Sequence, residues 1–297
     1  MGFVDRHFVR RIRATGIISG TALRVLRFLH LHLPALRAMH RADIEHCKSY
    51  YSNKDNARRI DKICESLGDQ ESVDTFMRVI MFQQGYRRED APKYSGGHYF
   101  PDDIVALTDS EVFVDCGAFT GDTVKDFIEK CHGRYSRIVC LEPDAHNFKK
   151  LARRTKKYDK ITLIRAGAWK ENAVLAFDGG MGFASRIADA GSAGLTVALE
   201  VVAIDKTEAC QGVTYLKMDI EGAEMDALRG AEETLRNFSP KLAISIYHSP
   251  EDMLGIPEYL HASFPRYKLY VRHHAHEEAA ETVLYAIPDQ LHTDGGS

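Results

Sequence analysis

The sequence predicts an α/β fold in which helices cover a mostly parallel sheet that closes with an antiparallel hairpin. Three apolar segments, at 112–114, 138–141 and 213–218, are each followed by an acidic residue and then by apolar residues at steps of three and four. This alternation of short strands and amphipathic helices is typical of βαβ units, whose strands are parallel. Two further segments rich in β-branched and aromatic residues, at 267–273 and 281–287, follow one another closely and predict the terminal hairpin.

The remaining segments complete this architecture. The other predicted strands lie at 161–165, 173–177, 195–203 and 240–247, of which the middle two form an inserted pair. Apolar spacing predicts one helix over 220–235, and two helices before the sheet, at 57–67 and 71–84. A last helix is predicted to begin with Ser249 as its cap and Pro250 in its first position.

The first strand is followed by Asp115, Gly117 and Gly121, in the spacing Asp-x-Gly-x-x-x-Gly. Glycine has no Cβ, so it permits tight turns and a close approach of the backbone to a ligand. A strand, a glycine turn and a helix N-terminus form a common site for nucleotide-like ligands, although a purely structural turn can carry the same residues. An acid before the first glycine suits a ligand with an ammonium group, such as the aminoacyl part of S-adenosylmethionine. We predict that this loop binds a cofactor through Asp115, Gly117, Ala118, Phe119, Thr120 and Gly121.

Glu142 and Pro143 follow the second strand, and Asp144 stands directly before the next helix. An acid at the tip of the second strand of a βαβ unit can accept both hydroxyls of a ribose. Acids near a helix N-terminus are also favoured by the helix dipole, but Asp144 fits that capping position better than Glu142 does. We therefore assign ribose binding to Glu142, with Pro143 beside it. Ala168 and Trp169 are predicted beside the adenine, and a place in the core is the alternative for this sole tryptophan.

Four charged residues, Lys217, Asp219, Glu221 and Glu224, gather where the third of the apolar segments ends and a helix begins. Open α/β sheets hold their sites at the carboxyl ends of their strands. Acids in a first helical turn also match the helix dipole, so Glu224 by itself indicates little. A lysine two residues before an aspartate at a buried strand end indicates a site more strongly, and His248 follows the neighbouring strand.

These motifs make the sequence similar to the FkbM family of S-adenosylmethionine-dependent methyltransferases. The most specific match is the string Lys-x-Asp-x-Glu-Gly-x-Glu at 217–224. One departure concerns Tyr247, because family members often carry a glutamate in the position before His248. The similarity extends over roughly 99–288, and its other matching segments are 113–123, 141–144, 240–248 and 267–287.

The resemblance implies a Rossmann-like class I methyltransferase sheet, whose terminal hairpin a plain dehydrogenase lacks. It also implies O-methylation of a small molecule, sugar or glycan, with S-adenosylmethionine as the methyl donor. Methyl transfer is an in-line displacement that depends on positioning, and an alcohol reacts better when a base removes its proton. We predict His248 as this base, Asp219 as the residue that orients it or the acceptor, and Lys217 as a stabiliser of negative charge. Glu221 completes the predicted catalytic set.

Alternatives remain open at these positions. His248 is alternatively a residue that only precedes a helix cap. The acids and His248 are also suited to Mg²⁺ or Ca²⁺, since hard cations prefer carboxylate oxygens, but the sequence favours a site without metal. An NAD-dependent oxidoreductase would place an acid on the ribose as well, but it prefers the Gly-x-Gly-x-x-Gly fingerprint that this chain lacks. A non-catalytic S-adenosylmethionine-binding or scaffold protein would keep the fold and lose the acids.

The composition, 44% hydrophobic and 27% charged, is that of a soluble globular protein. The six cysteines are scattered without a C-x-x-C pair, which is typical of reduced core thiols in a cytoplasmic protein. The best apolar stretch, 17–36, is interrupted by arginines, histidines and a proline. We therefore predict neither a membrane span nor a signal peptide, and expect a cytoplasmic location.

Residues 1–41 hold eight arginines, no lysine and one acid, Asp5. Its part at 4–37 either lies on an anionic membrane surface as a basic amphipathic helix, or docks on the acidic remainder of the chain or on a second copy in a homo-oligomer. Nucleic-acid binding is not expected, because the basic run lacks interleaved tyrosine and tryptophan. We divide the chain into an arginine-rich and helical extension at 1–98, a methyltransferase domain at 99–290 and a flexible tail at 291–297.

Overall fold

The computed structural model describes residues 34–85, 91–178, 196–276 and 280–289. Most of the segment for which a basic helix is predicted, up to residue 33, and the predicted tail at 291–297 lie outside these residues. The chain divides into two compact units: the first comprises 1–96 with Val271–Thr282, and the second comprises 97–270 with Val283–Ser297. Within the described ranges, every helix is too short or too polar to span a bilayer.

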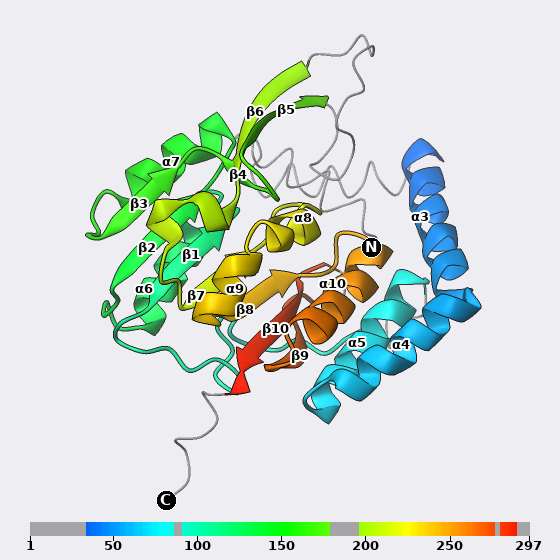
Figure 1. The fold of residues 1–297 in the computed structure, drawn as a ribbon. Coiled ribbons are helices and arrows are strands. Elements are labelled where there is room, and N and C mark those ends of the chain that lie inside the picture. Colours follow the sequence, from blue (N-terminus) through cyan, green and yellow to red (C-terminus); the bar gives the residue numbers. More distant parts are fainter. Residues whose placement is uncertain (1–33, 86–90, 179–195, 277–279, 290–297) are drawn as a thin grey trace, which may run out of the picture. The chain divides into compact units, whose positions relative to one another are not determined.

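Three helices dominate the described part of the first unit: α3 (Pro34–Ser52), α4 (Lys54–Ser66) and α5 (Gln70–Gln83) (Figure 1). Helices α4 and α5 confirm the two predicted helices, whereas α3 was not predicted. The side chain of Asn53 accepts the N–H of Asp55 at 2.8 Å, and that of Asp69 accepts the N–H of Ser72 at 2.7 Å. These caps satisfy N–H groups that have no partner inside the helix, which explains why α4 and α5 begin where they do.

The first unit also includes the end of strand β9 (Tyr267–His273), which contacts α5. The N–H of Val271 donates to the Ser72 hydroxyl at 2.9 Å. The guanidinium of Arg272 donates to the same hydroxyl at 3.0 Å and to the carboxylate of Asp69 at 2.8 Å. The cap of α5 therefore also anchors residues that are about 200 positions away in the sequence.

Most of a seven-stranded sheet belongs to the second unit, in the order β3-β2-β1-β7-β8-β10-β9 (Figure 1). Besides β9, its strands are β1 (Val112–Cys116), β2 (Arg137–Leu141), β3 (Ile161–Ile164), β7 (Tyr215–Met218), β8 (Lys241–Ser245) and β10 (Thr282–Pro288). Neighbouring strands pair in parallel from β3 through β2, β1 and β7 to β8, whereas β10 pairs antiparallel with β8. The predicted α/β fold with a mostly parallel sheet and closing antiparallel strands is confirmed.

The register of the central strands determines where the site forms. Strands β1 and β7 pair so that Asp115 lies beside Lys217 and Cys116 beside Met218. Because these strands are parallel, Gly117 and Asp219 leave the sheet at the same edge. The glycine loop after β1 and the acidic residues after β7 are therefore neighbours in space.

In its described part, the second unit carries the α-helices α6 (Asp122–Lys130), α7 (Ala145–Thr155), α8 (Glu224–Arg229), α9 (Glu232–Phe238) and α10 (Pro250–Ser263). Helix α10 begins at the predicted cap, since the hydroxyl of Ser249 accepts the N–H of Asp252 at 3.0 Å. A smaller sheet with the order β4-β6-β5 consists of β4 (Gly167–Ala168), β5 (Ala173–Asp178) and β6 (Thr196–Val202). The antiparallel pairing of β5 with β6 confirms the predicted inserted pair.

The single helix predicted over 220–235 is wrong, because the chain divides it into α8 and α9 at Gly230. A Cβ at Gly230 would lie 2.1 Å from the backbone oxygen of Trp169. The Gly230 oxygen accepts the N–H of Asp205 at 2.9 Å, and the Asp205 carboxylate accepts the N–H of Thr234 at 2.8 Å. A distant part of the chain thus ends one helix and caps the next, which apolar spacing alone does not reveal.

Aromatic side chains fill the core of the second unit. Phe113 and Phe127 are fully buried and stack with ring centroids 4.4 Å apart, and Tyr215 packs against Phe113. Burial of each such ring stabilises the fold by about 1.5–3 kcal/mol. Val124 and Ile128 are buried with Phe127, so apolar residues at steps of three and four form the inner face of α6. The cysteines of this unit are free and buried, as predicted for core thiols: Cys116, Cys131, Cys140 and Cys210.

Candidate active site

The glycine loop after β1 packs closely on the ends of both neighbouring strands. Gly117 has a φ of +80°, and a Cβ there would lie 2.1 Å from the backbone oxygen of Asp219. The N–H groups of Gly117 and Ala118 both donate to the Leu141 oxygen at 3.0 Å. Gly121, with a φ of +85°, begins α6 in the left-handed region that favours glycine. The glycine at 117 is thus required by the approach of β7, a reason that the spacing of the motif does not show.

Glu142 holds the backbone of this loop. Its Oε2 accepts the N–H of Phe119 at 2.8 Å, and its Oε1 accepts the N–H of Asp144 at 2.9 Å. Burial raises the pKa of Glu142 to about 7, although the two N–H groups favour the carboxylate. Each carboxylate oxygen has a second acceptor position, so these contacts leave room for the predicted hydrogen bonds from ribose hydroxyls.

The other residues predicted to bind the cofactor differ in burial. Thr120 is buried, and its hydroxyl accepts a hydrogen bond from Arg154. Ala168 is buried in β4, whereas Pro143 and Trp169 are half-buried. The N–H of Trp169 donates to the end of β6 at 2.9 Å. Trp169 is therefore not a fully buried core residue, and its contact with an adenine stays a prediction.

Lys217 and Asp115 form a buried ion pair next to the loop. The ammonium of Lys217 lies 3.0 Å from Asp115 Oδ1, and it donates to the backbone oxygens of Gly117 at 3.0 Å and Cys116 at 3.4 Å. Burial lowers the pKa of Lys217, but the charges of the nearby carboxylates outweigh this effect and raise it. An ammonium has three N–H donors, and these contacts use all of them. The structure thus directs Lys217 at Asp115 and the backbone of the glycine loop, and its contact with an acceptor oxygen stays a prediction.

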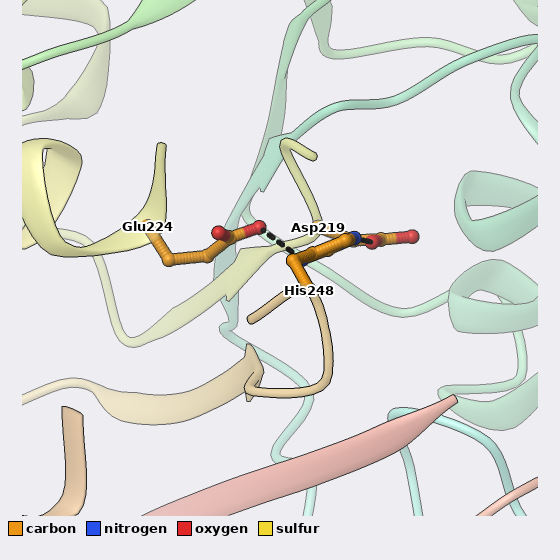
Figure 2. A group of neighbouring side chains, drawn as sticks. All are labelled: Asp219, Glu224 and His248. Atoms are coloured by element: carbon orange, nitrogen blue, oxygen red, sulfur yellow. Dashed lines mark ion pairs between the residues drawn. The ribbon is translucent and has the colours of Figure 1, made fainter. Parts of the chain in front are cut away.

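Asp219, Glu221, Glu224 and His248 form an acid–imidazole cluster where β7 and β8 end. The Nδ1 of His248 lies 3.2 Å from Glu224 Oε1, and its Nε2 lies 3.4 Å from Asp219 Oδ1 and 3.7 Å from Glu221 Oε2. Figure 2 shows Glu224 and Asp219 on opposite sides of His248. Glu224 is fully buried and its Oε1 also accepts the N–H of Ile220 at 2.7 Å. The cluster thus includes an acid that the predicted catalytic set omits.

The acids of this cluster determine the charge of His248. Burial lowers the pKa of His248, but the carboxylates of Glu224, Asp219 and Glu221 outweigh it and raise the pKa to about 9. The imidazole is therefore protonated at neutral pH. It can act as the predicted base only after it has lost this proton, which occurs at alkaline pH.

Two tyrosine hydroxyls hold Asp219. Tyr99 donates to Oδ2 at 3.0 Å, and Tyr247 donates to Oδ1 at 3.3 Å. Tyr247 stands directly before His248, and its hydroxyl brings a hydrogen-bond donor rather than a further acid to Asp219. Sequence reasoning missed Tyr99 because it lies 120 residues before Asp219 and outside every motif.

The cluster also has the composition of a cation site. Asp219, Glu224 and His248 each offer a ligand atom, and these atoms lie within 4.8 Å of one another on buried side chains. Carboxylate and imidazole groups bind divalent ions, which require a deprotonated imidazole nitrogen. A cation among these side chains would therefore compete with a proton for an imidazole nitrogen of His248.

Comparisons with known proteins show the family of this chain. The family model of the methyltransferase FkbM domain matches residues 115–275, more than half of the chain. The chain belongs to the FkbM methyltransferase family. A crystal structure of methyltransferase FkbM from Methylobacillus flagellatus KT superposes with a TM-score of 0.67 at 29% sequence identity. The match covers 78% of this chain and 58% of that one, so this chain spans little more than half the length of that relative.

More distant structures resemble the chain in part. An rRNA methylase from Streptococcus thermophilus matches with a TM-score of 0.40 at 13% identity, over 61% of this chain and 88% of that one. Aeropyrum pernix fibrillarin with natively bound S-adenosyl-L-methionine matches with a TM-score of 0.39 at 14% identity, over 62% and 70% of the two chains. Likenesses at this level add nothing to the family assignment. No curated protein matches the sequence significantly.

Proposed function

We propose that this chain transfers the methyl group of S-adenosylmethionine to a hydroxyl of a small molecule, sugar or glycan. The observation that carries the proposal is the convergence of two groups of residues at one edge of the sheet. The glycine loop packs on the backbone of Asp219, whose side chain belongs to the acid–imidazole cluster. A donor at the loop and an acceptor at the cluster would be neighbours, as an in-line displacement requires.

The donor side offers groups that fit S-adenosylmethionine. Glu142 has acceptor positions left for the ribose hydroxyls. The buried carboxylate of Asp115 contacts Lys217 and, among the described residues, receives no other donor, so it retains acceptor capacity for the ammonium of the aminoacyl part. Ala168, Trp169 and Pro143 are proposed next to the adenine. When bound, the cofactor supplies a methyl group on a positively charged sulfur.

On the acceptor side, the acid–imidazole cluster binds and activates the hydroxyl. The carboxylate of Asp219 accepts the hydrogen bond of the acceptor hydroxyl and orients it. The Nε2 of His248, 3.4 Å from this carboxylate, receives the hydroxyl proton once its own proton has left. Asp219 and Glu221 then stabilise the imidazolium. Lys217 stabilises the glycine loop through its contacts with Asp115 and the loop backbone.

Calorimetry tests the donor side without any acceptor. S-adenosylhomocysteine should bind, and NAD and NADP should not. Gly117→Val should abolish this binding, because a side chain at φ +80° would collide with the Asp219 backbone. Gly133→Ala is the matched control, since Gly133 also has a positive φ, of +74°, but its Cβ would meet nothing within 4 Å. Tighter binding of NAD than of S-adenosylhomocysteine would favour the oxidoreductase alternative and overturn the proposal.

Labelled S-adenosylmethionine tests the acceptor side. A panel of methyl glycosides, nucleotide sugars and phenols is offered to the full chain, and the products are identified by their mass. Transfer to a hydroxyl is the expected result, and transfer to nitrogen or carbon would contradict O-methylation. Binding of S-adenosylhomocysteine with no transfer at all would favour a non-catalytic binding protein. Loss of activity in EDTA with recovery in Mg²⁺ would show that the cluster acts through a cation.

A further inference from the structure

Tyr99 adopts a backbone conformation that its surroundings impose. Its φ is +64°, in the left-handed region that residues with large side chains rarely enter. Its N–H donates to the hydroxyl of Tyr285 at 3.1 Å, and its backbone oxygen accepts a hydrogen bond from the hydroxyl of Tyr215. Both of these tyrosines are fully buried. A strained backbone that two buried side chains hold in place is a feature found mostly at functional sites.

The side chain of Tyr99 contacts both halves of the site. Its hydroxyl donates to Asp219 Oδ2 at 3.0 Å, and the ammonium of Lys217 lies 5.0 Å from the centre of its ring. The first contact is a charge-assisted hydrogen bond, and the second is a cation–π interaction in a buried place. Asp219 belongs to the acid–imidazole cluster, and Lys217 supports the glycine loop. Tyr99 thus links the two groups through one rigid ring.

We propose that Tyr99 is a positioning residue for methyl transfer. It fixes the Asp219 carboxylate, which binds the acceptor hydroxyl, relative to the glycine loop that Lys217 contacts. This inference rests on the proposed function, and Tyr99 lies outside the segment that the family model matches. The hydroxyl of Tyr99 uses an acceptor position on Oδ2, so the carboxylate cannot rotate freely. Oδ1 is then held towards His248 and towards the acceptor. The ring gives the buried Lys217 ammonium a fourth favourable contact beyond its three N–H acceptors.

The two contacts can be separated by substitution. Tyr99→Phe removes the hydroxyl and keeps the ring, whereas Tyr99→Leu removes both. Tyr135→Phe is the matched control, because the Tyr135 hydroxyl also donates inside the second unit, to the Asp159 oxygen at 2.9 Å, away from the cluster. The affinity for S-adenosylhomocysteine, the melting temperature, and kcat and KM on the methyl glycoside panel are measured for each variant.

Tyr99→Phe should lower kcat about tenfold, while the affinity for S-adenosylhomocysteine stays near that of the wild type. The lost hydrogen bond to a buried carboxylate should lower the melting temperature slightly. Tyr99→Leu should in addition weaken the binding of S-adenosylhomocysteine about fivefold to tenfold, since the cation–π contact with Lys217 is lost. Tyr135→Phe should leave kcat and this affinity unchanged. A drop in kcat at an unchanged affinity for S-adenosylhomocysteine is the result that a purely structural tyrosine does not produce.

Two results would overturn the inference. The first is a Tyr99→Leu variant that binds S-adenosylhomocysteine as tightly as the wild type, which calorimetry decides without any acceptor. The second is a Tyr99→Phe variant that loses stability, affinity and kcat together, because the residue would then be structural. If the wild-type chain itself does not bind S-adenosylhomocysteine, the proposed function fails instead. The two failures are therefore distinguishable.

Discussion

Two buried lysine–carboxylate pairs at opposite ends of strand β1 differ in how completely the carboxylate is satisfied. Before the strand, Glu111 receives the ammonium of Lys241, the N–H and hydroxyl of Thr108, and a further threonine hydroxyl. At the other end, Asp115 contacts Lys217 at 3.0 Å and receives no other donor among the described residues. Both carboxylates are fully buried, so the difference lies in their partners and not in their exposure.

The pKa values of the two acids follow their partners. Burial raises the pKa of Glu111, but Lys241 and the hydrogen bonds outweigh it, so the pKa lies below its usual range. For Asp115 burial outweighs Lys217, and the pKa is raised. A fully satisfied ion pair supports the fold, whereas an incompletely satisfied one is tolerated where a ligand completes it. Under the proposed function, this comparison gives the same strand a structural end and a functional end.

Substitution of the two lysines tests this division most strongly. Lys241→Met should cost about 3–5 kcal/mol of unfolding free energy, because it leaves the low-pKa carboxylate of Glu111 buried without its cation. Lys217→Met should cost less unfolding free energy, since Asp115 can take up a proton. It should, however, weaken the binding of S-adenosylhomocysteine by about tenfold or more. Urea unfolding and calorimetry measure the two effects. Equal losses of stability, or a loss of cofactor affinity in the Lys241 variant alone, would contradict the comparison.

The acid–imidazole cluster at the functional end predicts a pH dependence. His248→Gln should lower turnover at least about 100-fold, with little change in cofactor affinity. Because a base with a pKa of about 9 must lose its proton first, wild-type kcat should rise tenfold per pH unit towards pH 9 and then level off. A rate that is already constant between pH 6 and 8 would show that His248 is not the base.

The raised pKa of His248 also predicts how this residue affects the stability of the fold. A folded pKa raised from 6.5 to about 9 stabilises the fold fully below pH 6.5, and this contribution disappears as the pH rises through 9. The difference in unfolding free energy between the wild type and His248→Gln should therefore shrink from pH 6 to pH 10. Urea titrations at these two pH values measure it, and a difference that grows with pH would contradict the ion pairing.

A smaller effect is expected for Glu142, which lies between the loop and the start of α7. Ribose hydroxyls donate to the carboxylate, so the ionised form should bind the cofactor more tightly. With a pKa of about 7 in the free protein, the affinity for S-adenosylhomocysteine should fall about tenfold from pH 8 to pH 6. Glu142→Gln should remove this pH dependence. An unchanged slope in that variant would place the titrating group elsewhere.

The smallest effect concerns the arginine-rich segment at 1–41, far in sequence from both ends of β1. We propose that the full chain binds anionic vesicles weakly, with each arginine near the surface worth about 1 kcal/mol. Deletion of this segment should abolish vesicle sedimentation and leave S-adenosylhomocysteine affinity unchanged. Salt should weaken the sedimentation of the full chain. Insolubility of the shortened chain would instead assign the leucines of this segment to the folded body or to a second copy.

Local patterns in the sequence determined the order and type of most elements. Alternating apolar segments with helical spacing predicted the strands of the sheet, and the Ser249–Pro250 pair predicted the start of α10. The motif residues Gly117, Glu142 and Asp219 were brought to one edge because parallel strands end on the same side. Periodicity and helix caps act over a few residues and can therefore be recognised in the sequence. The parallel pairing of β1 with β7 joins strands that lie far apart, and it follows from the repeated order of strand and helix.

The tertiary structure alone decided which side chains meet at that edge. It directed Lys217 to the loop, added Glu224 to His248, and placed the Tyr99 hydroxyl on an aspartate 120 residues later. It also divided the predicted helix at Gly230, where a distant backbone oxygen leaves no room for a Cβ. These contacts join residues whose spacing carries no period. They arise only when the sheet closes and buried polar groups must find partners across the core.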